Sequence, residues 1–168
     1  MQGMTVKVVC DRGVTHEIVR HRLFMSYAQE STRYCNYGSG VQFILPPWVN
    51  IPTSAHEVYH LNDLPIGLYA IEDLTWFRLM AQAEAGYLSL LQGGWRPEQA
   101  RDVLPNSLKT EIVITAPLCG PERLRGTDMD YGWRHVFDQR CAPAAHPQMR
   151  EVMIPLREAA RELFPGVF

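Results

Sequence analysis

The chain has 168 residues, 46% hydrophobic and 20% charged, which is long enough to bury a core and typical of one globular domain. Its 16 basic and 18 acidic residues give a formal charge of −2, so no basic field points to a nucleic-acid polymer or an anionic membrane. No apolar run reaches membrane-spanning length, and four scattered cysteines favour reduced thiols in a cytoplasmic protein over a metal or disulfide framework.

Local patterns along the chain predict an α+β fold. β-Branched runs predict strands at residues 5–10, 41–45 and 109–115. Asp11 or Thr15 is expected to cap a first helix that carries residues 16–22, and residues 26–36 read as irregular. Further helices are predicted at residues 68–92, 97–104, 131–145 and 148–164.

Two of these helices carry a more detailed expectation. Pro155 is expected to kink or shorten the last helix, because proline removes a backbone hydrogen bond there. In the helix at 68–92, apolar residues recur at helical spacing and are expected to form core: Trp76, Leu79, Met80, Ala83, Tyr87, Leu90 and Leu91.

Arginine greatly outnumbers lysine among the basic residues. Only Lys7 and Lys109 are lysines, so 16 − 2 = 14 of the basic residues are arginines. The planar guanidinium fork suits phosphates and carboxylates, although a GC-rich genome explains the same bias equally well.

The densest concentration of chemically active side chains is Arg20-His21-Arg22, followed by the segment QESTRY at residues 29–34. On a helix, Arg20 and Arg22 would project about 200° apart, so they would serve two ligands or a ligand and a neighbouring subunit. Surface salt bridges, each contributing about 0–1 kcal/mol, are the alternative interpretation of this segment.

The segment RHR followed by Ser-x-Arg resembles the signature of the flavin-dependent thymidylate synthases. Other segments resemble further motifs of that family, in the same order: RDVLP at 101–105, KTE at 109–111, WRHVF at 133–137 with Arg140, and AAHPQMR at 144–150. The likeness covers residues 5–46 and 68–164.

The resemblance implies one domain over residues 1–168, with a helix bundle packed on a small mixed or antiparallel sheet. It implies FAD bound without a Rossmann fold, and the chain has no GxGxxG motif. It also implies methylation at C5 of UMP or dUMP, with methylenetetrahydrofolate as carbon donor and NADPH or NADH as reductant of the flavin. A homotetramer with sites at subunit junctions is the implied assembly.

Individual roles follow by position from the same resemblance. Arg140, beside the uracil edge, and Arg20 are implied to be catalytic. The implied nucleotide contacts are Arg20, Gln29 or Glu30, Ser31, Thr32, Arg33, Arg101 and Arg140. The implied flavin contacts are Arg20, His21, Arg22, Asp130 and His146, and no metal is implied.

Three features depart from the family pattern. The spacer from Leu23 to Glu30 has eight residues rather than seven, which leaves the choice between Gln29 and Glu30 open. The family's usual N-terminal segment is absent, and residues 119–129 read as an insertion that puts Met129 or Asp130 where the family has a flavin-binding asparagine. These departures indicate a specialised relative. The short length and Arg-rich composition are similar to the UMP/dUMP methylases of polyoxin-type nucleoside antibiotic biosynthesis, so such a biosynthetic role is expected.

Two other functions remain open. His56-Glu57-Val58-Tyr59-His60 spells HExxH, which on a helix would place two histidines on one face for zinc in a hydrolase. A non-catalytic homologue that binds flavin or nucleotide is the second alternative.

Overall fold

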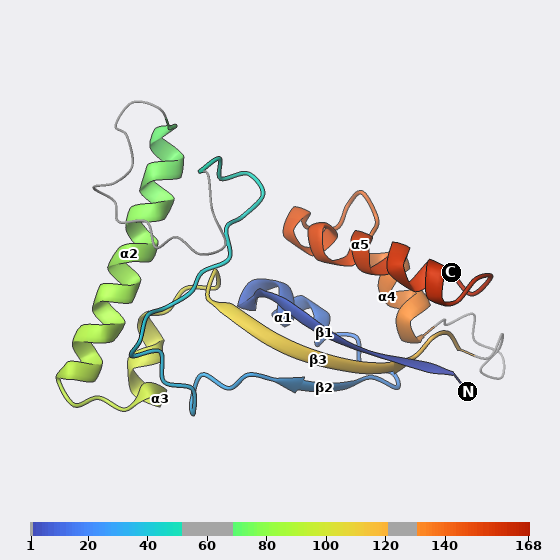
Figure 1. Cartoon of the computed structure of the whole chain (residues 1–168), viewed down its shortest axis with the longest axis horizontal. Helices are drawn as coiled ribbons and strands as arrows, with labels where there is room; N and C mark the ends of the chain where they lie inside the picture. The colour runs from blue at the N-terminus through green and yellow to red at the C-terminus, as the bar shows by residue number, and fades with distance from the viewer. Residues whose placement is uncertain (1, 52–68, 121–130) are drawn as a thin grey trace. The chain divides into compact units, whose positions relative to one another are not determined.

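The computed structural model describes residues 2–51, 69–120 and 131–168 (Figure 1). The chain divides into two compact units. Unit 1 combines the two ends of the chain, Met1–Glu30 and Lys109–Phe168, and unit 2 is the stretch between them, Ser31–Leu108. The HExxH segment lies outside the described residues, as does Asp130.

Unit 1 is built on a three-stranded antiparallel sheet. Its strands are β1 (Gly3–Asp11), β2 (Ser26–Gln29) and β3 (Lys109–Pro117), in the order β1-β3-β2. Both outer strands pair with β3, so β1 and β2 never pair with each other. The predicted α+β class is therefore confirmed, and of the two sheet types expected, the antiparallel one is present.

Two strand predictions were wrong. The stretch expected to be irregular contains β2, whose side chains alternate between exposed and half-buried from Ser26 to Gln29. Its four residues are too few to show a pattern by themselves, and pairing with β3 fixes them as a strand. The strand expected at 41–45 is reduced to an isolated bridge between Phe43 and Leu108.

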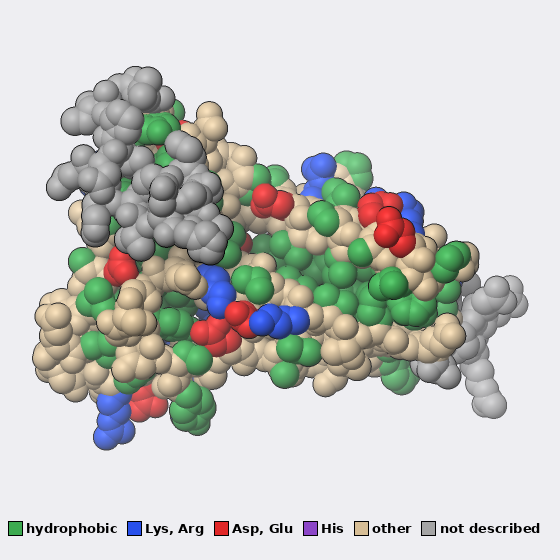
Figure 2. Space-filling model, in the orientation of Figure 1, with side chains coloured by type: hydrophobic (Ala, Val, Ile, Leu, Met, Phe, Trp, Pro, Cys, Tyr) green, Lys and Arg blue, Asp and Glu red, His purple; other side chains and the backbone are tan. Residues whose placement is uncertain are grey.

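The core of unit 1 lies on one face of the sheet. Alternate residues of β3, including Ile112 and Ile114, are fully buried there. Three helices contribute to the same apolar cluster: α1 (Arg12–Ile18), α4 (Gly132–Arg140) and α5 (Pro147–Leu163). Figure 2 shows hydrophobic side chains gathered between α5 and the strands. On the opposite face, Val9 is 48% and Val113 36% exposed.

Helix α1 is shorter than predicted, which changes the reading of the Arg20-His21-Arg22 segment. Asp11 caps the helix, since its side chain accepts a hydrogen bond of 2.8 Å from the backbone N–H of Val14. The helix ends at Ile18, and Tyr27 Oη lies within hydrogen-bond distance of the carbonyl oxygens of both Ile18 and His21. Arg20 to Arg22 therefore occupy a turn rather than a helix, and the helical projection of about 200° does not apply.

Unit 2 contains α2 (Ile71–Gln92), α3 (Pro97–Ala100) and the 3₁₀ helix η2 (Arg101–Val103), close to their predicted positions. Of the seven α2 residues expected to form core, only Tyr87 is buried, and Leu79 is 52% exposed. Tyr87 Oη accepts a hydrogen bond of 3.2 Å from the backbone N–H of Tyr37. Trp76, Leu90 and Leu91 are partly buried and pack against apolar clusters of this unit, so the predicted core stripe is confirmed in part, and Leu79 is the member that lies exposed.

Helix α4 is shorter than the predicted 131–145, whereas α5 lies within one residue of its predicted ends and continues through Pro155, which does not shorten it. All four cysteines are free thiols. Within the part of the chain that the structure describes, no helix combines the length and apolarity needed to cross a membrane.

Candidate active site

The turn after α1 and the start of α4 enclose a pocket of about 210 Å³ in unit 1. Eight residues line it: Arg20, His21, Arg22, Leu23, Met25, Tyr131, Gly132 and His135. Arg20 and Arg22 are exposed, and their guanidinium groups make no hydrogen bond or ion pair within the described residues. The pocket therefore presents two unpaired cations beside an apolar lining.

His21 is fixed in its neutral form. Arg140 Nε donates a hydrogen bond of 2.9 Å to His21 Nε2, which makes that nitrogen an acceptor. Burial, the charge of Arg140 and the nearby His135 together lower the pKa of His21 from 6.5 to about 4. The rings of His21 and His135 meet edge to face with centroids 5.4 Å apart. His21 can therefore offer only its Nδ1 proton to a ligand.

Arg140 is held by α1 and the turn after it through all three of its guanidinium nitrogens. Nη1 donates to Glu17 Oε2 at 2.6 Å, Nη2 donates to the backbone oxygen of Glu17 at 3.0 Å, and Nε donates to His21. The side chain of Arg140 is 20% exposed, so its charge is partly shielded from water. The sequence predicted a role for Arg140 but none for Glu17, whose contact with Arg140 joins residues 123 positions apart.

The eight-residue spacer is accommodated by a tight turn. Leu23 and Phe24 form this turn before β2, and Phe24 has a φ of 57°. Among the described residues, Phe24 is the only non-glycine residue with a positive φ. Its ring lies 4.6 Å from that of Tyr131, measured between centroids.

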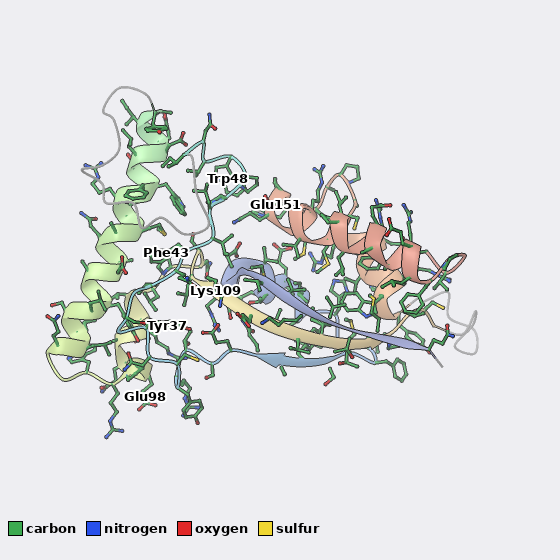
Figure 3. The ribbon with its side chains drawn as sticks, viewed as in Figure 1. Tyr37, Phe43, Trp48, Glu98, Lys109 and Glu151 are labelled. Atoms are coloured by element: carbon green, nitrogen blue, oxygen red, sulfur yellow. The ribbon has the colours of Figure 1, made fainter. Side chains whose placement is uncertain are left out.

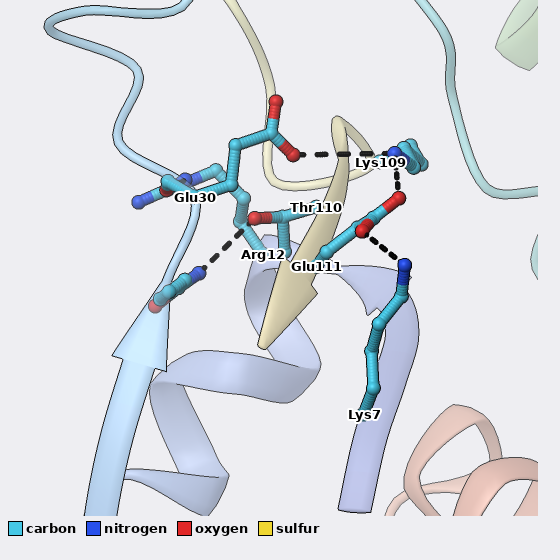
Figure 4. Close-up of polar contacts among 7 residues, drawn as sticks. Lys7, Arg12, Glu30, Lys109, Thr110 and Glu111 are labelled. Carbon is cyan, nitrogen blue, oxygen red and sulfur yellow. Dashed lines mark hydrogen bonds and ion pairs between the residues drawn. The ribbon is translucent and has the colours of Figure 1, made fainter. Parts of the chain in front are cut away.

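Gln29 and Glu30, the two candidates for the acidic contact position, have side chains in different surroundings. Gln29 Nε2 donates to Thr15 Oγ1 at 2.9 Å and to Thr110 Oγ1 at 3.3 Å, so its amide faces buried threonines. Glu30 follows β2, and its carboxylate lies 4.0 Å from Lys109 Nζ (Figure 4). The Glu30 side chain therefore lies beside a charged group, whereas the Gln29 amide lies between two hydroxyls.

A row of charges extends from Glu30 along the exposed face of the sheet (Figure 4). Glu111 lies between Lys109 Nζ at 2.8 Å and Lys7 Nζ at 2.6 Å. Hydrogen bonds from Lys109 and then Lys7 lower the pKa of Glu111 to about 2. Both lysines of the chain are thus paired with one carboxylate, and the arginines supply the other positive charges.

In unit 2, a second group of predicted residues surrounds the turn that starts at Ser31. The backbone N–H groups of Tyr34 and Cys35 donate to the carbonyl oxygen of Ser31, which closes the turn. Arg101 Nη1 donates to Thr32 Oγ1 at 3.0 Å, and Thr32 is 5% exposed.

Arg33 projects from the same turn. Its guanidinium carbon lies 5.4 Å from the centroid of the Tyr34 ring, and its Nε is 4.0 Å from Glu98. Glu98 projects from α3 and is labelled in Figure 3. In unit 2, the Arg101 guanidinium is therefore directly paired with a hydroxyl, and Arg33 lies beside an acidic group.

The remaining predicted residue is His146, the exposed residue that precedes α5, and it is not among the residues that line the pocket. Five pocket residues were not predicted to have a role: Leu23, Met25, Tyr131, Gly132 and His135. His135 stands within the WRHVF segment that carried the resemblance, so its motif was the signal that could have identified it.

Comparison with known proteins gives the family directly. Residues 1–166 match the family described as thymidylate synthase complementing protein. A flavin-dependent thymidylate synthase of Geobacter sulfurreducens is 26% identical over 158 residues, which cover 94% of this chain and 55% of that protein. The enzyme of the same name from Mycobacterium avium is 29% identical over 164 residues, covering 94% and 56% respectively.

The chain thus spans about half the length of the curated relatives it matches. The family match nevertheless extends over both compact units and over every motif described above. The chain therefore belongs to the thymidylate synthase complementing protein family, the family of the flavin-dependent thymidylate synthases.

Proposed function

We propose that the protein is a methyltransferase that methylates C5 of a uridine nucleotide, UMP or dUMP, with FAD as cofactor. Methylenetetrahydrofolate supplies the carbon and NADPH the reducing equivalents. The observation that carries the proposal is the unit 1 pocket, where Arg20 and Arg22 stand unpaired beside the neutral His21. Arginines without a carboxylate partner favour an anionic ligand.

The pocket fits part of a large cofactor. Its volume of about 210 Å³ is below the roughly 300–1,000 Å³ of sites that enclose a whole drug-sized ligand. Two guanidinium groups and the Nδ1–H of His21 can donate to ring nitrogens, carbonyl oxygens or a pyrophosphate. When bound, FAD supplies the hydride chemistry that no side chain of the protein can perform.

The role proposed for Arg140 is electrostatic. Its guanidinium is partly shielded and fixed in place by Glu17 and His21, so it needs little reorganisation when negative charge develops on the pyrimidine. In unit 2, Ser31, Thr32, Arg33 and Arg101 are proposed to hold the nucleotide phosphate, and Glu30 is proposed as the acidic contact.

We further propose that the active form is a homotetramer, as the resemblance implies. Exposed apolar side chains on α2 support an assembly that buries them, because Ile71 is 79% and Leu79 52% exposed in the single chain. We also propose a role in nucleoside antibiotic biosynthesis, because the chain departs from the family pattern. The eight-residue spacer that turns at Phe24 is one of these departures and lies within the described residues.

The test is a product assay by mass spectrometry. The protein is incubated with FAD, NADPH and methylenetetrahydrofolate, and UMP and dUMP are supplied separately and together. We expect a mass gain of one methyl group on at least one nucleotide, and preference for UMP would support the biosynthetic role. Flavin bound without any product would instead favour the non-catalytic homologue.

A further inference from the structure

Phe24 combines two unusual properties at the mouth of the unit 1 pocket. It holds a φ of 57°, a conformation that bulky residues rarely adopt, and its side chain is 59% exposed. The strained backbone of Phe24 therefore does not serve to bury its apolar ring, because most of the ring remains in water. Such outliers concentrate at ligand sites, where the surrounding structure fixes them for a purpose.

The ring of Phe24 is held in one place by Tyr131. Their centroids are 4.6 Å apart with an interplanar angle of 39°, and Tyr131 is only 3% exposed. Tyr131 lines the pocket, as do Leu23 and Met25, the neighbours of Phe24. Phe24 is therefore an aromatic group mounted on a buried support at the edge of the pocket, with much of its surface open.

Resting on the function proposed above, we propose that Phe24 and Tyr131 form an aromatic wall against which the isoalloxazine ring of the flavin binds. Isoalloxazine has a polar edge of carbonyl and nitrogen acceptors and an apolar dimethylbenzene edge. The pocket offers the same division, with Arg20 and Arg22 as donors and Leu23, Met25 and Tyr131 as apolar surface. Adenine has no apolar edge of this kind, so it matches the pocket less well.

The test separates the two rings of FAD by measuring the binding of FMN and of ADP by isothermal titration calorimetry. The proteins are the wild type and the variants Phe24→Leu, Phe24→Gly and Phe24→Tyr, with Leu163→Ala as a control at an exposed apolar residue of the same unit. Loss of an aromatic contact is expected to weaken FMN binding about tenfold in the leucine and glycine variants. The tyrosine and control variants should keep the wild-type affinity, and ADP binding should not change.

Thermal unfolding distinguishes a binding role from a structural one. Glycine adopts a φ of 57° without strain, so Phe24→Gly should unfold at a temperature no lower than Phe24→Leu while still binding FMN weakly. Equal FMN affinities in the wild type and Phe24→Leu would overturn the aromatic wall and leave the proposed function intact. Equal weakening of FMN and ADP would also overturn it. A wild-type protein that binds neither FAD nor FMN would overturn both proposals.

Discussion

Arg140 Nε donates a hydrogen bond to His21 Nε2 at 2.9 Å, although the two residues are 119 positions apart in the chain. The direction of this bond decides the state of both groups. His21 must stay neutral to accept it, and Arg140 is thereby aligned with its other two nitrogens on Glu17. The last residue of α4 and the turn after α1 are joined through side chains that the sequence leaves far apart.

The lowered pKa of His21 predicts how stability depends on pH. The unfolded state takes up a proton below about pH 6.5, whereas the folded state takes it up only near pH 4. The stabilisation is therefore complete above about pH 6.5 and is lost as the pH falls through 4. Urea unfolding midpoints should decrease from about pH 7 to about pH 5 in the wild type, and less steeply in His21→Gln.

The titration of Glu111 does not contribute to the change in urea unfolding midpoint that is assigned to His21. Its lowered pKa of about 2 means that its contribution is lost only between about pH 4.5 and about pH 2. Identical slopes for the wild type and His21→Gln between about pH 7 and about pH 5 would contradict the assignment of a neutral His21.

Arg140→Ala should reduce kcat by about 10²-fold or more, because it removes the fixed positive charge that is proposed to stabilise the reacting pyrimidine. Product formation measured by mass spectrometry checks this. The matched control is Arg157→Ala, since Arg157 also pairs with a glutamate, Glu158 at 3.0 Å, but on the surface of α5. Full turnover by Arg140→Ala would end its catalytic assignment.

Glu17→Gln tests whether the carboxylate, rather than the backbone, positions Arg140. The glutamine keeps the size of the side chain and the backbone acceptor but removes the charge opposite Arg140 Nη1. We expect a loss of about 1 kcal/mol in the free energy of unfolding, since the glutamate is 37% exposed and its charge is screened. The measurement is urea denaturation, and an unchanged midpoint would show that the backbone contact alone suffices.

Thr32→Val should weaken nucleotide binding, because it removes the acceptor that Arg101 Nη1 uses at 3.0 Å. The loss is expected to be about tenfold, the scale of one hydrogen bond to a charged group. Calorimetric titration with dUMP and with UMP measures it. Thr32→Ser keeps the hydroxyl and should restore binding, whereas weak binding by both variants would indicate that packing rather than the hydroxyl matters.

Gly132→Ala should be strongly destabilising. Gly132 has a φ of 74°, and an added Cβ would lie 2.3 Å from the backbone oxygen of Pro117. Backbone strain and this overlap together are expected to lower the free energy of unfolding by about 3 kcal/mol or more. Gly94→Ala is the matched control, since its φ of 89° is also left-handed but nothing lies within 4 Å of the added atom. Equal losses in the two variants would show that conformation alone accounts for the effect.

Sequence patterns predicted the elements whose signal is local. The β-branched runs of β1 and β3 and the long helical repeat of α2 are confirmed nearly at their predicted ends. The end of α1 was not predictable in this way, because Tyr27 holds the turn from a neighbouring strand. The same limit explains β2, which exists through its pairing with β3.

The same distinction between local patterns and tertiary packing applies to the candidate site. The motif residues Arg20, His21 and Arg22 could be identified by resemblance, and they do line one pocket. The support of Arg140 by Glu17 could not be predicted, because it depends on how α4 packs beside α1. The α2 stripe is only partly buried for a physical reason: helical spacing shows that a face is apolar without showing what covers it.

The order of the strands has a consequence for how the chain folds as it is synthesised. β1 and β2 leave the ribosome first, but each pairs only with β3, which begins at Lys109 after the whole of unit 2 has been made. Unit 2 can therefore complete its folding while the first thirty residues still wait for their partner. The final step closes a long loop, which makes assembly of the sheet the slow stage of folding.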